Sequence, residues 1–150
     1  MTEKKIVLVD IDGTVAKMGD RLKHILSKEK DWDAYYSDDF DDEPIQDIVE
    51  LVGNLSQHYT IVFCTARSAV VRLKTITWCL KHFGQSAVNT MLLMRKENDH
   101  RVDTIVKPES VKEAGIALKD IAFVLEDRTS IVKKWRKLGL TVLQVADGDF

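Results

Sequence analysis

The sequence has little cysteine or proline and no long hydrophobic run. Its two cysteines, Cys64 and Cys79, do not form a metal-spaced set, and in a reducing compartment we expect buried thiols rather than a disulfide. No apolar run approaches the roughly 20 residues that cross a bilayer, which excludes membrane insertion. Residues 1–5 lead directly into apolar sequence without the longer apolar segment of a signal peptide. We therefore expect a cytoplasmic protein.

The sequence also lacks an excess of basic residues and a phosphate-binding glycine loop. Its 22 Lys and Arg residues are balanced by 24 Asp and Glu residues, giving a net charge of −2. This balance excludes nucleic-acid binding through bulk positive charge, so any polynucleotide contact has to be local. No GxxxxGK[ST] segment occurs, which excludes a P-loop kinase.

What is present is a regular alternation of strand and helix signals. The strand-like segments are short, rich in Val and Ile and apolar on both faces, as buried parallel strands are. We predict strands at 5–10, 60–64, 90–94, 121–125 and 141–145, and helices at 45–55, 70–83, 111–118 and 131–138, with Pro44 and Pro108 in first helical turns. The pattern predicts one domain over residues 1–150, an α/β fold with a central parallel sheet of about five strands and helices on both faces.

Residues 15–43 interrupt this alternation with a long polar insert after the first predicted strand. Ligands of open α/β folds bind beyond the carboxyl ends of the strands, so we interpret the insert as a small cap or flap. The alternative is a solvated surface excursion. Its acidic run, Asp38–Glu43, would repel a nucleic-acid backbone if it faced the site, or points into solvent. Its aromatic residues either stack on bases or anchor the insert to the core; they are Trp32, Tyr35 and Tyr36.

Two carboxylates follow the first predicted strand in the segment Asp10-Ile11-Asp12-Gly13-Thr14. A carboxylate in this position can coordinate Mg²⁺ and attack phosphorus, and a second can protonate the leaving oxygen and later activate water. Because Asp and Gly are common in turns for local hydrogen-bonding reasons, the motif is only moderately specific by itself.

Further polar groups follow other predicted strands. Glu126 and Asp127 add acids for a hard cation such as Mg²⁺, and clustered acids without a cation would repel one another. Thr65 can donate its hydroxyl to a phosphoryl oxygen, and Lys107 can neutralise charge on the same group. A lone Lys is usually a surface residue, so the ordered combination carries the prediction.

This combination resembles the haloacid dehalogenase (HAD) superfamily of phosphotransferases, whose four motifs match the residues just described. The resemblance implies a Rossmann-like fold and an Mg²⁺-dependent phosphatase with Asp10 as nucleophile and Asp12 as general acid and base. It also implies that Asp127 and the backbone carbonyl of Asp12 bind the metal. Glu126 stands where some members have Asp, and either direct binding or binding through water is open.

A closer resemblance is to the 3′-phosphatase domains of phage polynucleotide kinase/phosphatase. It is carried by Arg21, Arg67, the Asp103-x-x-x-Lys107 spacing, and the segments Glu126-Asp127-Arg128-Thr129, Trp135-Arg136-x-x-Gly139 and Gln144-Val145-Ala146-x-Gly148-Asp149-Phe150. It implies that Arg21 and Arg67 bind substrate or take part in catalysis, and that Asp103 orients Lys107.

We therefore expect a phosphatase that removes the 3′-phosphate from DNA or RNA ends through an aspartyl-phosphate, with a separate kinase or ligase as a possible partner. An alternative is a phosphatase of small metabolites such as mononucleotides, which would use the same chemistry under a different cap. A third interpretation is a non-catalytic binding protein that has this fold.

Overall fold

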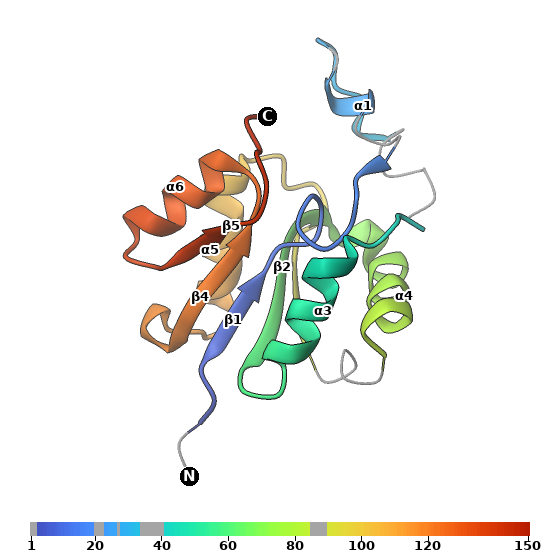
Figure 1. Cartoon of the computed structure of the whole chain (residues 1–150). Helices are drawn as coiled ribbons and strands as arrows, with labels where there is room; N and C mark the ends of the chain where they lie inside the picture. The colour runs from blue at the N-terminus through green and yellow to red at the C-terminus, as the bar shows by residue number, and fades with distance from the viewer. Residues whose placement is uncertain (1–2, 20–22, 27, 34–40, 85–89) are drawn as a thin grey trace.

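The centre of the molecule is a parallel five-stranded sheet with the strand order β3-β2-β1-β4-β5 (Figure 1). The computed structural model describes residues 3–19, 23–26, 28–33, 41–84 and 90–150. The strands are β1 (Ile6–Val9), β2 (Thr60–Ser68), β3 (Met91–Arg95), β4 (Ile121–Glu126) and β5 (Val142–Gln144). Because β2 and β4 lie on opposite sides of β1, the strand order reverses beside β1. In parallel sheets, such a reversal is where a ligand-binding crevice forms.

Helices cover both faces of the sheet. They are α3 (Gln46–Leu55), α4 (Arg72–Phe83), α5 (Asp103–Glu113) and α6 (Thr129–Lys137). The structure also has the short helix α1 (Lys23–Leu26) and the 3₁₀ turns η2 (Ala69–Val71) and η4 (Leu118–Asp120). The predicted α/β fold is thus confirmed. Over the ranges given above, no helix has the length and apolar character needed to span a membrane.

Successive residues of the central strand supply two separate cores. Val7 and Val9 pack with α3 and α4 on one face, where Trp78 is the largest buried side chain. Leu8 points to the other face and packs with α5 and α6, including Trp135. This alternation explains why the strand sequences are apolar throughout, since neither face meets water.

Several predicted boundaries differ from the structure, and two of them bear on the site. Strand β2 continues to Ser68, so Thr65 and Arg67 lie on the strand rather than after it. Helix α5 begins at Asp103, and the predictions of a start at 111 and of Pro108 in a first turn are wrong, because Pro108 lies inside the helix. Its ring nitrogen has no hydrogen to donate one turn back. Lys107 is consequently presented by a helix that packs on β2 and β3.

The insert leaves from the carboxyl end of β1 and returns before α3. Its two ends are joined by backbone hydrogen bonds, from Lys17 N to the Glu43 carbonyl at 2.8 Å and from Ile45 N to the Val15 carbonyl at 2.7 Å. Figure 1 shows α1 beyond the carboxyl edge of the sheet, where a cap would lie. Several residues with predicted roles are outside the described residues; these are Arg21, Tyr35, Tyr36 and 38–40 of the acidic run.

Candidate active site

The Asp10 carboxylate lies at the end of β1 under a tight turn. The turn is closed by backbone N–H groups of Thr14, Val15 and Ala16, which all donate to the carbonyl of Ile11. The Thr14 hydroxyl then donates to Asp10 Oδ2 at 3.0 Å. The turn therefore positions both the carboxylate and a hydroxyl that holds it.

Gly13 is the residue that allows this turn to approach β4. Its φ is +82°, a left-handed conformation that favours glycine. A Cβ at this position would lie 2.0 Å from Asp127 Oδ2. Any side chain here would displace Asp127, so the glycine keeps the two acidic segments in contact.

Lys107 reaches from α5 into the acidic group. Its Nζ donates to Asp10 Oδ1 and to Glu126 Oε2, each at 2.7 Å, and all three side chains are buried. Burial opposes the charged ammonium, but Asp10 and Glu126 outweigh that effect and raise the pKa of Lys107 well above its usual value. Lys107 is therefore a fixed positive charge directly beside Asp10.

Glu126 is held by backbone donors as well as by Lys107. Its Oε1 accepts hydrogen bonds from the backbone N–H groups of Asp127 and Arg128, each at 3.2 Å. Both of its oxygens therefore have protein partners.

Three carboxylates converge at this point with one ammonium among them. Ligand oxygens of Asp10, Glu126 and Asp127 all lie within 4.8 Å of one another, and the three residues are buried. Burial, reinforced by the charge of Glu126, raises the pKa of Asp127 to about 6 and that of Asp10 well above its usual value. The excess negative charge and the all-oxygen donor set fit a hard divalent cation such as Mg²⁺.

The Asp12 carboxylate pairs with Arg67. The guanidinium donates through Nε to Asp12 Oδ2 at 2.9 Å and through Nη2 to Asp12 Oδ1 at 2.6 Å. Arg67 Nη1 donates to Thr75 at 3.2 Å, and the Arg67 side chain is completely buried. This two-bond fork fixes the orientation of the carboxylate. A role for the Asp12 backbone carbonyl as a metal ligand stays a prediction.

Thr65 is buried next to Arg67 on β2. Its Oγ accepts a hydrogen bond from the Arg67 backbone N–H at 3.1 Å, so its own hydroxyl hydrogen can donate elsewhere. The predicted role of Thr65 in holding a phosphoryl oxygen agrees with this chemistry and stays a prediction.

Asp103 has different partners from those expected. Among the described residues its carboxylate pairs with Arg95 at 2.5 Å and with Arg128, and not with Lys107. Asp103 and Lys107 are one helical turn apart, but the two carboxylates of the site draw the ammonium inward. The prediction that Asp103 orients Lys107 by direct contact is therefore wrong.

The pairing of Arg95 and Arg128 with Asp103 was not predicted from the sequence. Arg95 also donates to the Ala66 carbonyl at 3.0 Å, which links the end of β3 to the end of β2. Both arginines stand at or just after the carboxyl end of a strand, which is the signal that could have identified them.

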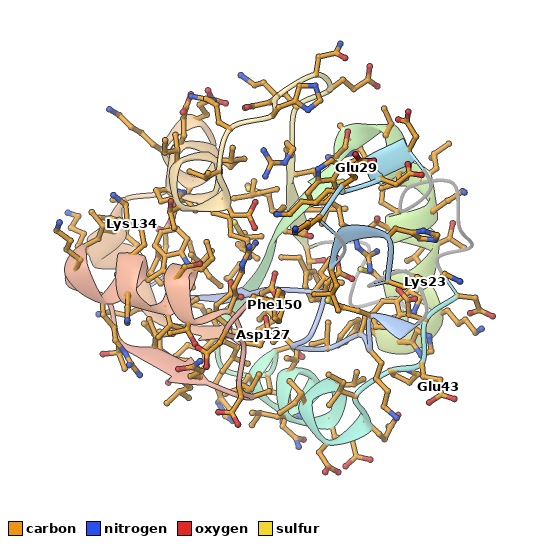
Figure 2. All side chains as sticks on the ribbon, turned by 90° about the horizontal axis from the view of Figure 1, so that it is seen from above. Lys23, Glu29, Glu43, Asp127, Lys134 and Phe150 are labelled. Carbon is orange, nitrogen blue, oxygen red and sulfur yellow. The ribbon has the colours of Figure 1, made fainter. Side chains whose placement is uncertain are left out.

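Residues 144–150 secure the segment that carries Asp127. Figure 2 shows Phe150 beside Asp127, and the Phe150 carbonyl accepts a hydrogen bond from Arg128 Nε at 2.6 Å. Gln144 Nε2 donates to the Asp127 carbonyl at 2.9 Å, and a Cβ on Gly148 would lie 2.3 Å from that carbonyl oxygen. This tight packing holds the backbone of Asp127 in place.

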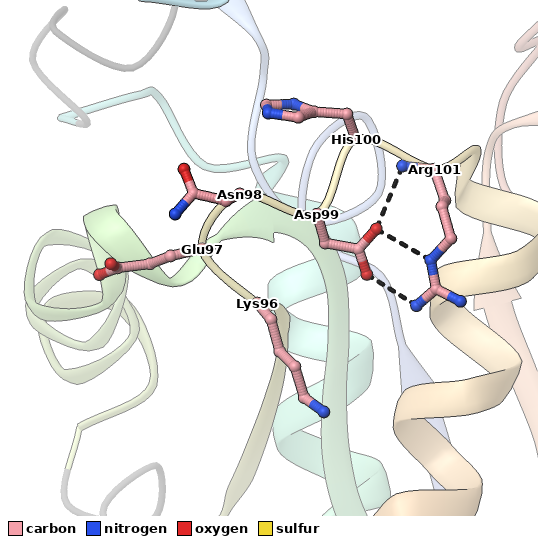
Figure 3. Close-up of a pocket in the computed structure, with 6 residues that line it drawn as sticks. All are labelled: Lys96, Glu97, Asn98, Asp99, His100 and Arg101. Carbon is pink, nitrogen blue, oxygen red and sulfur yellow. Dashed lines mark hydrogen bonds and ion pairs between the residues drawn. The ribbon is translucent and has the colours of Figure 1, made fainter.

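A wide, open pocket lies on the loop between β3 and α5 (Figure 3). It has a volume of about 540 Å³ and is lined by residues 96–101. Asp99 and Arg101 hold the loop together through paired hydrogen bonds. The pocket contains none of the residues of the acidic cluster, so the chemistry points to the cluster rather than to this pocket.

Comparisons with known proteins agree with this geometry. A family model described as the phosphatase domain of polynucleotide kinase PNKP matches residues 4–150. Among solved structures, a chain in a Pnkp1/Rnl/Hen1 complex is 26% identical with a TM-score of 0.78, and the match covers 100% of this chain and 48% of that chain. A second structure of this assembly is described as an RNA repair complex. This chain thus spans about half the length of that relative.

More distant structures share the fold alone. A haloacid dehalogenase-like hydrolase from Streptococcus pneumoniae is 13% identical, with a TM-score of 0.67 and coverage of 96% of this chain and 85% of that one. A class C acid phosphatase from Bacillus anthracis, with tungstate bound, is 15% identical, with a TM-score of 0.60 and coverage of 99% and 69%.

Proposed function

The chain belongs to the family of polynucleotide kinase phosphatase domains within the HAD superfamily, and from that premise we propose that it removes the 3′-phosphate from polynucleotide ends through an aspartyl-phosphate. The observation that carries this proposal is the buried Asp10 carboxylate, held between the Lys107 ammonium and the Thr14 hydroxyl. A carboxylate so fixed is set up for in-line attack on phosphorus.

The proposed cofactor is Mg²⁺. The side chains of Asp10 and Asp127 and the backbone carbonyl of Asp12 would hold it, with Glu126 either direct or through water. Glu126 already accepts three hydrogen bonds, two at Oε1 and one at Oε2, which leaves it less acceptor capacity than Asp10 has, so we favour the water-mediated arrangement. The chemistry that the bound metal supplies is neutralisation of negative charge on the phosphoryl group.

In the first proposed step, Asp10 attacks the phosphorus of the 3′-phosphate. A bond forms between an Asp10 oxygen and phosphorus as the bond from phosphorus to the 3′-oxygen breaks. Protonated Asp12 gives its proton to the departing oxygen, which leaves as a 3′-hydroxyl. Lys107 and the Thr65 hydroxyl stabilise the charge on the transferring group.

In the second step, water attacks the phosphorus of the aspartyl-phosphate. Asp12, now a carboxylate, takes a proton from that water, and the bond between Asp10 and phosphorus breaks. The products are inorganic phosphate and free Asp10, with Asp12 protonated again. Arg67 holds Asp12 in one orientation for both proton transfers.

The proposed product, a 3′-hydroxyl end, is what a ligase joins to a 5′-phosphate. We therefore propose that a separate kinase or ligase acts on the same ends. The relative found in an assembly with Rnl and Hen1 supports such a partnership for this chain.

Substrate choice is tested by phosphate release from matched substrates. We expect release from 3′-phosphorylated DNA or RNA oligonucleotides to exceed release from the 5′-phosphorylated oligonucleotide and from a 3′-mononucleotide by at least tenfold in kcat/KM, or about 1.4 kcal/mol. Faster release from the mononucleotide would instead support a phosphatase of small metabolites. If the protein released phosphate from none of these substrates and from no chromogenic phosphomonoester, that result would support a non-catalytic binding protein.

Binding of Mg²⁺ should stabilise the protein more at neutral pH than in acid. In the metal-free protein the folded-state pKa of Asp127, about 6, lies above its unfolded value of roughly 3.9. Protonation of Asp127 therefore stabilises the folded state fully below about pH 4, and this contribution is lost as the pH rises through about 6. Metal then replaces the proton, because the ligands must be deprotonated.

The measurement is the melting temperature with and without Mg²⁺ across this range. The increment in melting temperature that Mg²⁺ causes should be largest above about pH 7 and should disappear near about pH 5. An increment that does not change with pH would contradict a metal bound by these acids. The Asp127→Asn variant should lose most of the increment, and the exposed Asp120→Asn should retain it.

A further inference from the structure

The returning end of the insert is fastened to α4 through two neighbouring acids. The backbone carbonyl of Asp42 accepts a hydrogen bond from Trp78 Nε1 at 2.8 Å. The Asp41 carboxylate pairs with Lys81 at 2.7 Å, and both of these side chains are more than half exposed. Asp41 thus makes a surface ion pair, of the kind that contributes little.

The Asp42 carboxylate faces the interior instead. Its Oδ2 lies 3.4 Å from Arg67 Nη2, and the two side chains are 6% and 0% exposed. The same nitrogen donates to Asp12 Oδ1 at 2.6 Å. Because Nη2 carries two hydrogens, one guanidinium nitrogen serves a carboxylate from the insert and a carboxylate from the active site.

Arg67 is therefore fixed from three sides. The Asp12 carboxylate accepts hydrogen bonds from Nε and Nη2, and the Thr75 hydroxyl accepts one from Nη1. The Asp42 carboxylate accepts a second hydrogen bond from Nη2. Asp42 is the member of this group that belongs to the insert. The position of the guanidinium, and with it the orientation of Asp12, depends on how the insert sits on α4.

We propose that Asp42 is a positioning residue for the proton transfers of Asp12, acting through Arg67. This inference rests on the proposed phosphatase function and extends it, because it couples the seating of the insert to the acid-base step. It also separates Asp42 from Asp41, which has the same charge and the same helix beneath it but does not contact Arg67 in the described interactions.

The test compares Asp42→Asn with Asp41→Asn on two small phosphomonoesters, phenyl phosphate and p-nitrophenyl phosphate. Such small substrates need few contacts with the insert, so the loss of contacts between the insert and a polynucleotide does not affect the result. Phenol is the poorer leaving group and needs the proton from Asp12 more. General acid-base catalysis contributes about 10²–10⁴-fold, so a misplaced acid should cost a measurable part of that.

We expect Asp42→Asn to lower kcat/KM for phenyl phosphate by about tenfold or more, and to lower it much less for p-nitrophenyl phosphate. Asp41→Asn should stay near wild type for both. Equal losses on the two substrates, or equal behaviour of the two variants, would overturn the proposal, because a merely structural role does not depend on the leaving group.

A double-mutant cycle gives a second measurement. In an Asp12→Asn background, adding Asp42→Asn should have no further effect on phenyl phosphate, since the assisted step is already lost. Losses that multiply would overturn the proposal. If Asp42→Asn does not fold, Asp42→Glu keeps the charge and should stay near wild type for both substrates; an equal loss on both would contradict the proposal.

Different results would contradict the proposed function and this inference. Wild-type protein that hydrolyses neither substrate, or whose activity is unaffected by Asp10→Asn, would remove the phosphatase mechanism itself. A wild-type enzyme that depends on Asp10, with Asp42→Asn equal to Asp41→Asn, would remove only the role of Asp42.

Discussion

Replacing Asp10 with asparagine should abolish phosphate release and leave the fold intact. An amide does not attack phosphorus to form a stable acyl-phosphate, and loss of a catalytic nucleophile costs roughly 10⁴–10⁶-fold in kcat. The Asn side-chain oxygen can still accept a hydrogen bond from Lys107, and its amide N–H can donate to the Thr14 hydroxyl oxygen, so the side chain stays held from both sides. The measurement is kcat for a 3′-phosphorylated oligonucleotide together with the melting temperature.

The matched control is Asp120→Asn, which makes the same change at an exposed position. It should keep full activity and stability. If Asp10→Asn retained more than about a hundredth of the wild-type rate while folded, Asp10 would not be the nucleophile.

Replacing Lys107 with methionine should reduce both stability and activity. The change leaves the buried Asp10 and Glu126 carboxylates without the cation that lies 2.7 Å from each. Breaking a buried pair by removing one partner costs about 3–5 kcal/mol, and losing a charge that stabilises the transition state costs about 10²–10³-fold in rate. Denaturant unfolding of the metal-free protein and kcat/KM are the measurements.

Two comparisons sharpen this prediction. Lys112→Met, at an exposed position of the same helix, should change the free energy of unfolding by less than about 0.5 kcal/mol. Mg²⁺ should raise the stability of Lys107→Met more than that of wild type, because it then neutralises a larger unpaired charge. A variant as stable as wild type without metal would show that the ion pairs do not offset the burial of the carboxylates.

Much of the fold could be predicted because its strands have an unambiguous pattern. Val7, Leu8 and Val9 are apolar in succession since both faces of β1 are buried, and this is typical of a central parallel strand. The start of α5 could not be read in the same way. Its first turn contains buried Val106 but also Ile105, which is 48% exposed, so the apolar periodicity is blurred there.

The meeting of Asp10, Glu126 and Asp127 follows from topology, since carboxyl ends of neighbouring parallel strands share one edge. β1 and β4 are paired directly, which brings these acids together. The sequence could not predict which of several nearby charges a side chain chooses. Asp103 pairs with Arg95 and Arg128 and not with Lys107 among the described residues, because the pairing depends on side-chain directions that are set by the packed structure.

The pairing of Arg67 with Asp12 was also beyond the sequence pattern. The two residues are far apart in the chain, and their contact needs β2 to continue past Thr65 as a strand. The motif predicted that Arg67 belongs to the site, and its role in holding Asp12 is a proposal from the geometry.

The most direct measurement is to trap the proposed intermediate. Wild-type protein and the Asp12→Asn variant would be mixed with an oligonucleotide carrying a radiolabelled 3′-phosphate, quenched rapidly in acid, and digested for peptide mapping. We predict labelled phosphate on Asp10, with more of it in Asp12→Asn because water attack on the intermediate is slowed. Release of labelled phosphate by wild-type protein with no label on the protein at any time, or with label on a residue other than Asp10, would contradict the account.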